Sequence, residues 1–340
     1  ISTRGAQANG RSGDGRLGTR PAISADGRVV AFHSQASNLV EGDTNRAADV
    51  FVRDRLTGET ARVSVSTQGA QGSDDSVRPA LSGDGRVVAF ESRAKNLDLA
   101  RPNPDGISQV YVHDRELGRT DLISFGIDGL AGDAASGDTA ISAGGRFVAF
   151  SSYATNLVPG DANGAAHIFV YDRQRNTLER VSVSSAGIPA NRDALTPALS
   201  AGGRYVAYAS AASNLVNGDA NGAVDIFVHD RLARHTSRAS LAVTAAWTGV
   251  EADADSYGPS ALAADGRFVA FVSAAANLAT GDDNGVADVF IHERADLPAY
   301  TLAGRIVDTA NRPLEGVVVR AGPHSATTGS DGRFAFTHIT

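Results

Sequence analysis

Residues Ser82–Phe90 read SGDGRVVAF, and close relatives of this phrase recur along the chain. A short Gly/Asp turn followed by a run of β-branched and aromatic residues is typical of a turn that leads into a strand. The arginines of the five copies lie about 60 residues apart, which indicates a repeated structural unit. These arginines are Arg28, Arg86, Arg146, Arg204 and Arg267.

A second phrase recurs with the same period. Residues 214–231 read NLVNGDANGAVDIFVHDR, and similar segments begin at Asn38, Asn156 and Asn277, with a degraded copy from Asn96. Each unit contains short runs rich in Val, Ile, Phe and Tyr, separated by Gly, Asn and Asp, and none shows the spacing of an amphipathic helix. Four strands per unit, repeated radially, predict an all-β protein of the β-propeller class.

The repeats predict a five-bladed β-propeller. The expected blades span residues 16–74, 75–134, 135–193, 194–255 and 256–297, and the last contains only three strand-like runs. The opening residues ISTRGAQ match the end of VSVSTQGAQ in the first unit, so we expect strand 1–7 to close the last blade. Such closure would remove the exposed sheet edges. The alternative is a ring of six or more blades with further repeats upstream.

The unit resembles the TolB-type β-propeller repeat over about residues 16–295, through the S-x-D-G-R-x-V-A-F and D-I-F-V-x-D-R phrases. This resemblance implies an exported bacterial protein, extracytoplasmic in the periplasm, in the medium or on the cell surface. Propellers of this type act as protein-binding modules, glycan-acting domains and gates on peptidases.

A different pattern occupies residues 298–340. It resembles the first half of a carboxypeptidase regulatory-like domain, a transthyretin-like β-sandwich, and the resemblance implies an accessory spacer or adhesion module. The residues that carry it are Gly304, Arg305, Val307, Pro313, Leu314, Gly316, Val317, Thr328, Asp331, Gly332, Phe334 and Phe336.

Composition narrows the possible partners. The 340 residues carry a net charge of −7, which argues against a nucleic-acid partner. No apolar run approaches the ~18 residues of a membrane helix, so no membrane span is expected. The chain has no cysteine, hence no disulfide or thiolate metal site. The chain also has no methionine and begins within a repeat, so we interpret it as an internal fragment. Separately, we expect the protein to be a monomer.

The loops of the second phrase are candidate calcium sites. Oxygen ligands in a glycine-bearing loop suit Ca²⁺, which is the one possible cofactor. The competing interpretation is turn chemistry, because Asp, Asn and Gly favour tight turns for their own backbone reasons. It is favoured by the third copy, which has His167 in place of an aspartate, and by the second copy, which lacks the pattern. The candidate ligands are Asp43, Asn45 and Asp49, then Asp219, Asn221 and Asp225, then Asp282, Asn284 and Asp288.

Positions that differ between repeats are the candidate ligand-binding residues, since a binding site must break the symmetry. The first strand of each blade should line the central channel, where Arg20, Arg78, Asp138 and Tyr257 would form a polar funnel. Trp247 lies in the longest inter-blade loop, where an exposed indole would suit stacking on a sugar or a peptide. The alternative is that Trp247 fills a gap between blades four and five. A further repeat position holds histidines and tolerates Arg and Tyr, so we predict a strand surface site for His113, His229 and His292.

The chain contains no G-x-S-x-G, H-E-x-x-H or phosphate-binding glycine loop. We therefore expect a non-catalytic binding or scaffold propeller that recognises a protein or polysaccharide through its loop-bearing face. Two alternatives remain open: an accessory propeller of a larger secreted hydrolase acting on peptides or glycans, and a calcium-dependent adhesin.

Overall fold

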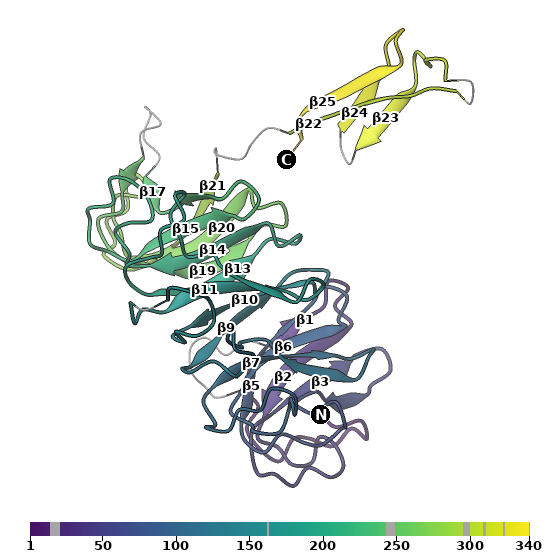
Figure 1. Cartoon of the computed structure of the whole chain (residues 1–340), viewed down its shortest axis with the longest axis vertical. Helices are drawn as coiled ribbons and strands as arrows, with labels where there is room; N and C mark the ends of the chain where they lie inside the picture. Colours follow the sequence, from purple (N-terminus) through teal and green to yellow (C-terminus); the bar gives the residue numbers. More distant parts are fainter. Residues whose placement is uncertain are drawn as a thin grey trace. The chain divides into compact units, whose positions relative to one another are not determined.

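The computed structural model describes residues 1–13, 21–161, 163–242, 249–294, 300–308, 311–321 and 324–339. All regular elements in these ranges are β-strands (Figure 1). Because these ranges contain no helix, none of them offers a helical membrane span. The chain forms two compact units, Ile1–His292 and Glu293–Thr340.

The first unit is a series of antiparallel sheets, each built from strands in chain order, which we call blades one to five. Blade one contains β1 (Ala22–Ile23), β2 (Val29–Ser34), β3 (Asp49–Asp54) and β4 (Thr60–Arg62). Blade two contains β5 (Ser76–Leu81), β6 (Val87–Ser92), β7 (Gln109–Asp114) and β8 (Arg119–Leu122). Blade three contains β9 (Ser136–Ile141), β10 (Phe147–Ser152), β11 (His167–Asp172) and β12 (Thr177–Arg180).

Blade four contains β13 (Ala194–Leu199), β14 (Tyr205–Ser210), β15 (Asp225–Asp230) and β16 (His235–Arg238). A small ribbon follows, made of β17 (Leu241–Ala242) and β18 (Val250–Glu251). Blade five has three strands in the described residues, β19 (Ser256–Leu262), β20 (Phe268–Ser273) and β21 (Asp288–Glu293). The prediction of repeated four-stranded antiparallel blades in an all-β protein is thus confirmed.

The SGDGR turn shows why the repeated phrase is needed. The Ser82 hydroxyl donates to Asp84 (2.5 Å) and accepts the Val87 backbone N–H (2.9 Å). Gly85 adopts φ +71°, and a β-carbon there would lie 2.9 Å from the side chain of Val29 in the preceding blade. Glycine therefore permits both the turn and the close approach of neighbouring blades.

The core lies between blades, where an aliphatic face meets an aromatic face. Val50 and Val52 of β3 belong to the same buried cluster as Phe90 and Tyr111 of blade two. The rings of these two aromatics stack with centroids 6.0 Å apart. Similar clusters join blade two to three and blade three to four. Every blade has such a stacked aromatic pair on its second and third strands.

The segment after the fourth strand reaches onto the next blade. Thr120 of β8 donates its hydroxyl to the Val65 carbonyl, and its N–H donates to Thr67 Oγ1 (3.1 Å). Thr60 of β4 makes the same pair of contacts with Ile1 (2.8 Å) and Thr3 (2.8 Å). The N-terminal residues therefore lie on blade one as the tail of a preceding blade would. Pairing between strand 1–7 and β21 is not among the described contacts.

The second unit contains two small antiparallel sheets. One pairs β22 (Tyr300–Arg305) with β25 (Arg333–Ile339), and the other pairs β23 (Val318–Ala321) with β24 (His324–Thr327). Thr328 connects the second sheet to the loop before it, because its hydroxyl donates to the Leu314 carbonyl (2.6 Å) and accepts the Val317 N–H (2.9 Å).

Candidate functional site

A cavity of about 640 Å³ opens where blades two, three and four meet at their first strands. It lies where β5 and β9 begin and where β6 and β10 end, which is the side that carries the long loops between second and third strands. Its lining carries charges of both signs and one tyrosine. The ionisable lining residues are Asp75, Arg78, Glu91, Arg93, Asp138 and Tyr153.

A backbone bulge positions the two predicted residues at this cavity. The pairing of the first with the second strand shifts register just after Val77 in blade two and just after Gly137 in blade three. Arg78 and Asp138 occupy these irregular points with left-handed φ values of 51° and 52°. Thr196 has φ 53° at the same point of blade four, so the bulge is a common feature of the blades. Only the side chain it presents is specific to each blade.

Glu91 of β6 joins the two residues. Its side chain is buried, and it accepts the Asp138 backbone N–H (2.9 Å) and lies 3.4 Å from Arg78 Nη1. Arg78 Nη1 in turn lies 3.7 Å from Asp138 Oδ1. Burial raises the pKa of Glu91, and the positive charge of Arg78 opposes this shift. A β-carbon at Gly137 would lie 2.9 Å from the Glu91 carboxylate, so glycine makes room for it.

Glu91 was not among the predicted residues, because the funnel was sought in the first strands only. The sequence nevertheless marks its position on the second strand. The residue after the V-A-F or V-A-Y of the first phrase differs in every repeat. It is His33, Glu91, Ser151, Ala209 and Val272 in turn. In blade three, Ser151 Oγ donates to Asp138 Oδ2 (3.1 Å), so this second-strand position faces the bulge. Variation at both facing positions marks the cavity.

The other predicted binding residues do not line this cavity in the described part of the chain. Tyr257 lies on β19 with 52% of its surface exposed, and it is not among the residues that line the cavity. Arg20 and Trp247 lie outside the described residues. Tyr153 was not predicted; it is 44% exposed beside the cavity, and its hydroxyl donates to Asp193 (3.2 Å).

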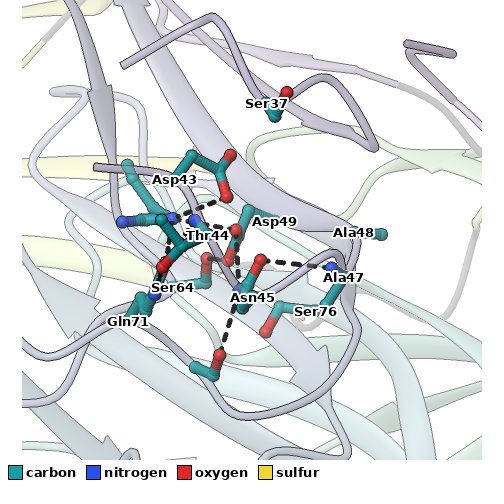
Figure 2. Close-up of polar contacts among 12 residues, drawn as sticks. Ser37, Asp43, Thr44, Asn45, Ala47, Ala48, Asp49, Ser64, Gln71 and Ser76 are labelled. Atoms are coloured by element: carbon teal, nitrogen blue, oxygen red, sulfur yellow. Dashed lines mark hydrogen bonds and ion pairs between the residues drawn. The ribbon is translucent and has the colours of Figure 1, made fainter. Parts of the chain in front are cut away.

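In the predicted calcium loop of blade one, Asp43, Asn45 and Asp49 lie close together (Figure 2), and an arginine of β4 lies among the acids. Arg62 of β4 lies 3.2 Å from Asp43 and 3.1 Å from Asp49, both of which have buried side chains. Asp49 also accepts the Asn45 amide (3.0 Å) and the Ser64 hydroxyl (2.5 Å). The guanidinium places one positive charge beside the two carboxylates and so offsets part of their repulsion without a metal ion.

Blade four repeats this arrangement and blade two replaces it. Arg238 lies 3.3 Å from Asp219, 3.2 Å from Asp225 and 2.8 Å from Glu251. Asn221 donates to Asp225 (3.1 Å), as Asn45 does to Asp49. Blade two has the neutral pair Gln109 and Leu122 at the positions of the aspartate and the arginine. Acid and arginine are therefore lost together.

Blade five keeps the acids. Asn284 donates to Asp288 (2.9 Å), and Asp282 lies in the same loop. Among the described residues, none of the ion pairs joins an arginine to these two carboxylates. The described ranges also contain no cluster of three or more His, Cys, Asp or Glu that could hold a metal. The calcium assignment of the three loops stays a prediction, and the geometry of blades one and four favours the arginine.

His113 and His229 of the third strand are buried, contrary to the predicted surface site, whereas His292 is half-buried. His113 is 7% exposed and bonds through Nδ1 to Thr120 Oγ1 (2.8 Å), and His229 bonds likewise to Thr236 (2.9 Å). Burial lowers the pKa of both imidazoles to about 4. Arg, Tyr and His share the position because each reaches a hydrogen-bond partner at the blade edge, and this chemistry does not appear in the local sequence.

No family model matches the chain, and no curated protein matches it. Solved structures do match it in part. The β-propeller domain of the Trilobed protease from Pyrococcus furiosus is 11% identical, with 95% of this chain and 78% of that chain covered and a TM-score of 0.48. A putative TolB from Agrobacterium tumefaciens is 14% identical, with coverage of 94% and 80% and a TM-score of 0.45. TolB from Acinetobacter baumannii is 14% identical, with a TM-score of 0.39; the match covers 93% of this chain but spans only about half (53%) of that one.

Proposed function

We propose that this chain is a non-catalytic binding module that recognises an extended segment of a partner protein through the cavity between blades two and three. The observation that carries the proposal is the group formed by Arg78, Glu91 and Asp138 at the bulges of two neighbouring blades. Charges of both signs lie within one opening, beside the half-exposed ring of Tyr153. Such a surface suits a ligand that carries both charges and amide groups, as a polypeptide does.

Two features explain why the cavity would bind rather than react. The Glu91 carboxylate is already engaged by the Asp138 N–H and by Arg78, and Asp138 is engaged by the Ser151 hydroxyl. The lining contains no His, Cys or Lys, so the common nucleophile–base pairs of covalent catalysis are not formed there. Their remaining hydrogen-bonding capacity, at Arg78 above all, faces the opening, since 44% of its side chain is exposed.

We further propose that blades one to five form one closed propeller, extracytoplasmic and monomeric, followed by a carboxypeptidase regulatory-like spacer. Two observations support the ring. The contacts of Ile1 and Thr3 with Thr60 repeat those that the tails of blades one and three make with Thr120 and Thr236 of the next blade. The aliphatic face of blade five would then pack on the Phe32–Phe51 pair of blade one, as the other aliphatic faces pack on such pairs.

The ring can be tested because the chain has no cysteine. In the double variant Ile291→Cys with Phe32→Cys, mild oxidation should produce a monomeric disulfide-linked chain with altered mobility on a non-reducing gel. Either single variant serves as the control. Formation of only intermolecular dimers would contradict the closed ring.

The binding proposal is tested with a peptide array and a glycan array probed in parallel. Wild-type protein should bind a subset of peptides that contain both acidic and basic residues, and Arg78→Ala should lose most of that signal. Arg175→Ala removes an equally charged, exposed side chain at the opposite end of blade three and should bind like the wild type. Equal binding by all three proteins, or binding to glycans alone, would overturn the proposal.

A further inference from the structure

A second cavity, of about 490 Å³, lies between blades three and four. None of the residues that line it lines the cavity described above. Its walls come from the end of β12, from the tail that follows at residues 183–187, and from the third strand and the turn between β15 and β16 in blade four. A cavity of this size can hold a small-molecule ligand.

The same place between blades two and three is filled by aromatic side chains. Val183 and His229 line the cavity, and their counterparts one blade earlier are Phe125 and Tyr171. The rings of these two aromatics meet edge to face with centroids 6.0 Å apart, and Arg101 lies over the Phe125 ring (4.0 Å). Between blades three and four, smaller side chains at both positions leave the space open.

Arg234 lines this cavity from a backbone position that favours glycine. It lies in the turn between β15 and β16 with a left-handed φ of 53°. The same position holds Gly58 in blade one, Gly118 in blade two and Asn176 in blade three, which are the residue types that adopt this conformation most readily. Backbone strain of this kind is common where a side chain serves a function. Blade four thus places an arginine at the cavity at a cost to its turn.

The lining carries a positive charge that the described acids do not offset. Two of its three arginines have acidic partners, since Arg231 pairs with Glu179 and Arg180 lies 3.2 Å from Asp161. Arg234 is exposed, and no ion pair or hydrogen bond joins its side chain to another residue in the described part of the chain. The cavity is therefore locally cationic in a protein whose net charge is −7.

Arg231 supplies a second guanidinium in a fixed orientation. Its Nη1 donates to the Gly203 carbonyl (2.6 Å), its Nε donates to Glu179, and its guanidinium lies over the Phe147 ring (4.4 Å). These contacts hold the side chain in place, and among the described contacts its Nη2 has no hydrogen-bond partner. A preoriented guanidinium loses less freedom when it binds an anion.

We propose that this cavity binds a small ligand through an oxyanion group, phosphate or carboxylate, which Arg234 holds with Arg231 beside it. Guanidinium groups match both oxyanions through paired, charge-assisted hydrogen bonds. The cavity is larger than an oxyanion alone, so an attached organic group has room between the blades. The site is separate from the peptide-binding cavity proposed above and does not depend on it.

The test measures the Tm of the intact chain in sodium phosphate, sodium glucuronate and sodium chloride at one ionic strength. Phosphate stabilises many proteins by exclusion from their surface, so the readout is the difference between wild type and variant. Arg234→Gly introduces the residue of blades one and two, and without ligand its Tm should equal or exceed that of the wild type. The wild type should gain more Tm than this variant in phosphate, glucuronate or both. Arg175→Ala removes an exposed arginine outside the lining and should respond like the wild type.

Broadening of the phosphorus NMR signal of inorganic phosphate, or of the proton signals of glucuronate, detects weaker binding directly. Arg234→Gly should lower the affinity by about tenfold or more, as expected for the loss of charge-assisted hydrogen bonds. Arg234→Lys should retain part of the affinity, because it keeps the charge but loses the paired donors. A response to one probe alone would identify the oxyanion. Equal responses of wild type and Arg234→Gly to both probes, or no response in either assay, would overturn the proposal.

Discussion

Replacing Arg238 by leucine should destabilise the protein strongly, and a second substitution should restore most of the loss. Arg238 is the counter-charge of Asp219, Asp225 and Glu251, and its own side chain is 7% exposed. The Asp225 side chain is fully buried, so Arg238→Leu leaves an uncompensated charge in the blade. Breaking a buried pair in this way costs about 3–5 kcal/mol.

Blade two supplies the design of the rescue. Gln109 and Leu122 show that the same site is stable with a neutral pair, so Arg238→Leu with Asp225→Gln should recover roughly half or more of the loss, leaving about 1–2 kcal/mol. The residual reflects Asp219, whose pKa burial already raises. Urea unfolding followed by fluorescence or circular dichroism measures all three variants, with Asp225→Gln alone completing the cycle.

The reasoning would be refuted by either of two results. If the single Arg238→Leu variant lost less than about 1 kcal/mol, the acids would not depend on the guanidinium. If the double variant were less stable than the single variant, the parallel with blade two would fail. High salt should change the difference in stability between the wild type and the single variant little, because the buried pair of the wild type is screened much less than a surface pair.

Four further predictions concern other sites in the protein. Glu91→Gln should weaken peptide binding at pH 7 yet leave the Tm equal or higher, because it removes a buried charge whose pKa burial raises; a lower Tm with unchanged binding would contradict this. Stability should fall as the pH drops from 6.5 towards 4, because His113 and His229 have folded-state pKa values of about 4 and the unfolded chain takes up these protons first. The cost is at most roughly 3 kcal/mol for each histidine, and His113→Gln should flatten the pH profile measured by thermal unfolding. Adding calcium or a chelator to residues 1–297 should leave the Tm unchanged if arginine compensates the loops, whereas a large upward shift with calcium would make them metal sites. Gly203→Ala should cost more than about 2 kcal/mol in urea unfolding, because its β-carbon would lie 2.3 Å from Phe147 of the preceding blade at φ +69°; a neutral result would show that the blades can separate there.

The fold could be predicted because each repeated phrase acts locally. A turn such as that at Gly85 and the strand after it depend on adjacent residues, so five copies predict five similar sheets. The bulge residues Arg78 and Asp138 could be found because they differ between otherwise similar repeats. The role of Arg62 could not, since it lies 19 residues from Asp43 and only strand pairing brings it into the loop. Glu91 was missed for the related reason that its partner at Asp138 lies 47 residues away.

The contact of each blade tail with the following blade has a consequence for synthesis on the ribosome. Val65 and Thr67 complete their hydrogen bonds only with Thr120, more than 50 residues further along the chain. A nascent blade therefore remains partly unsatisfied until its successor has emerged, and co-translational folding should lag behind synthesis by about one repeat. Ile1 and Thr3, in contrast, bond to Thr60 of blade one, so these hydrogen bonds can form as soon as that blade is made.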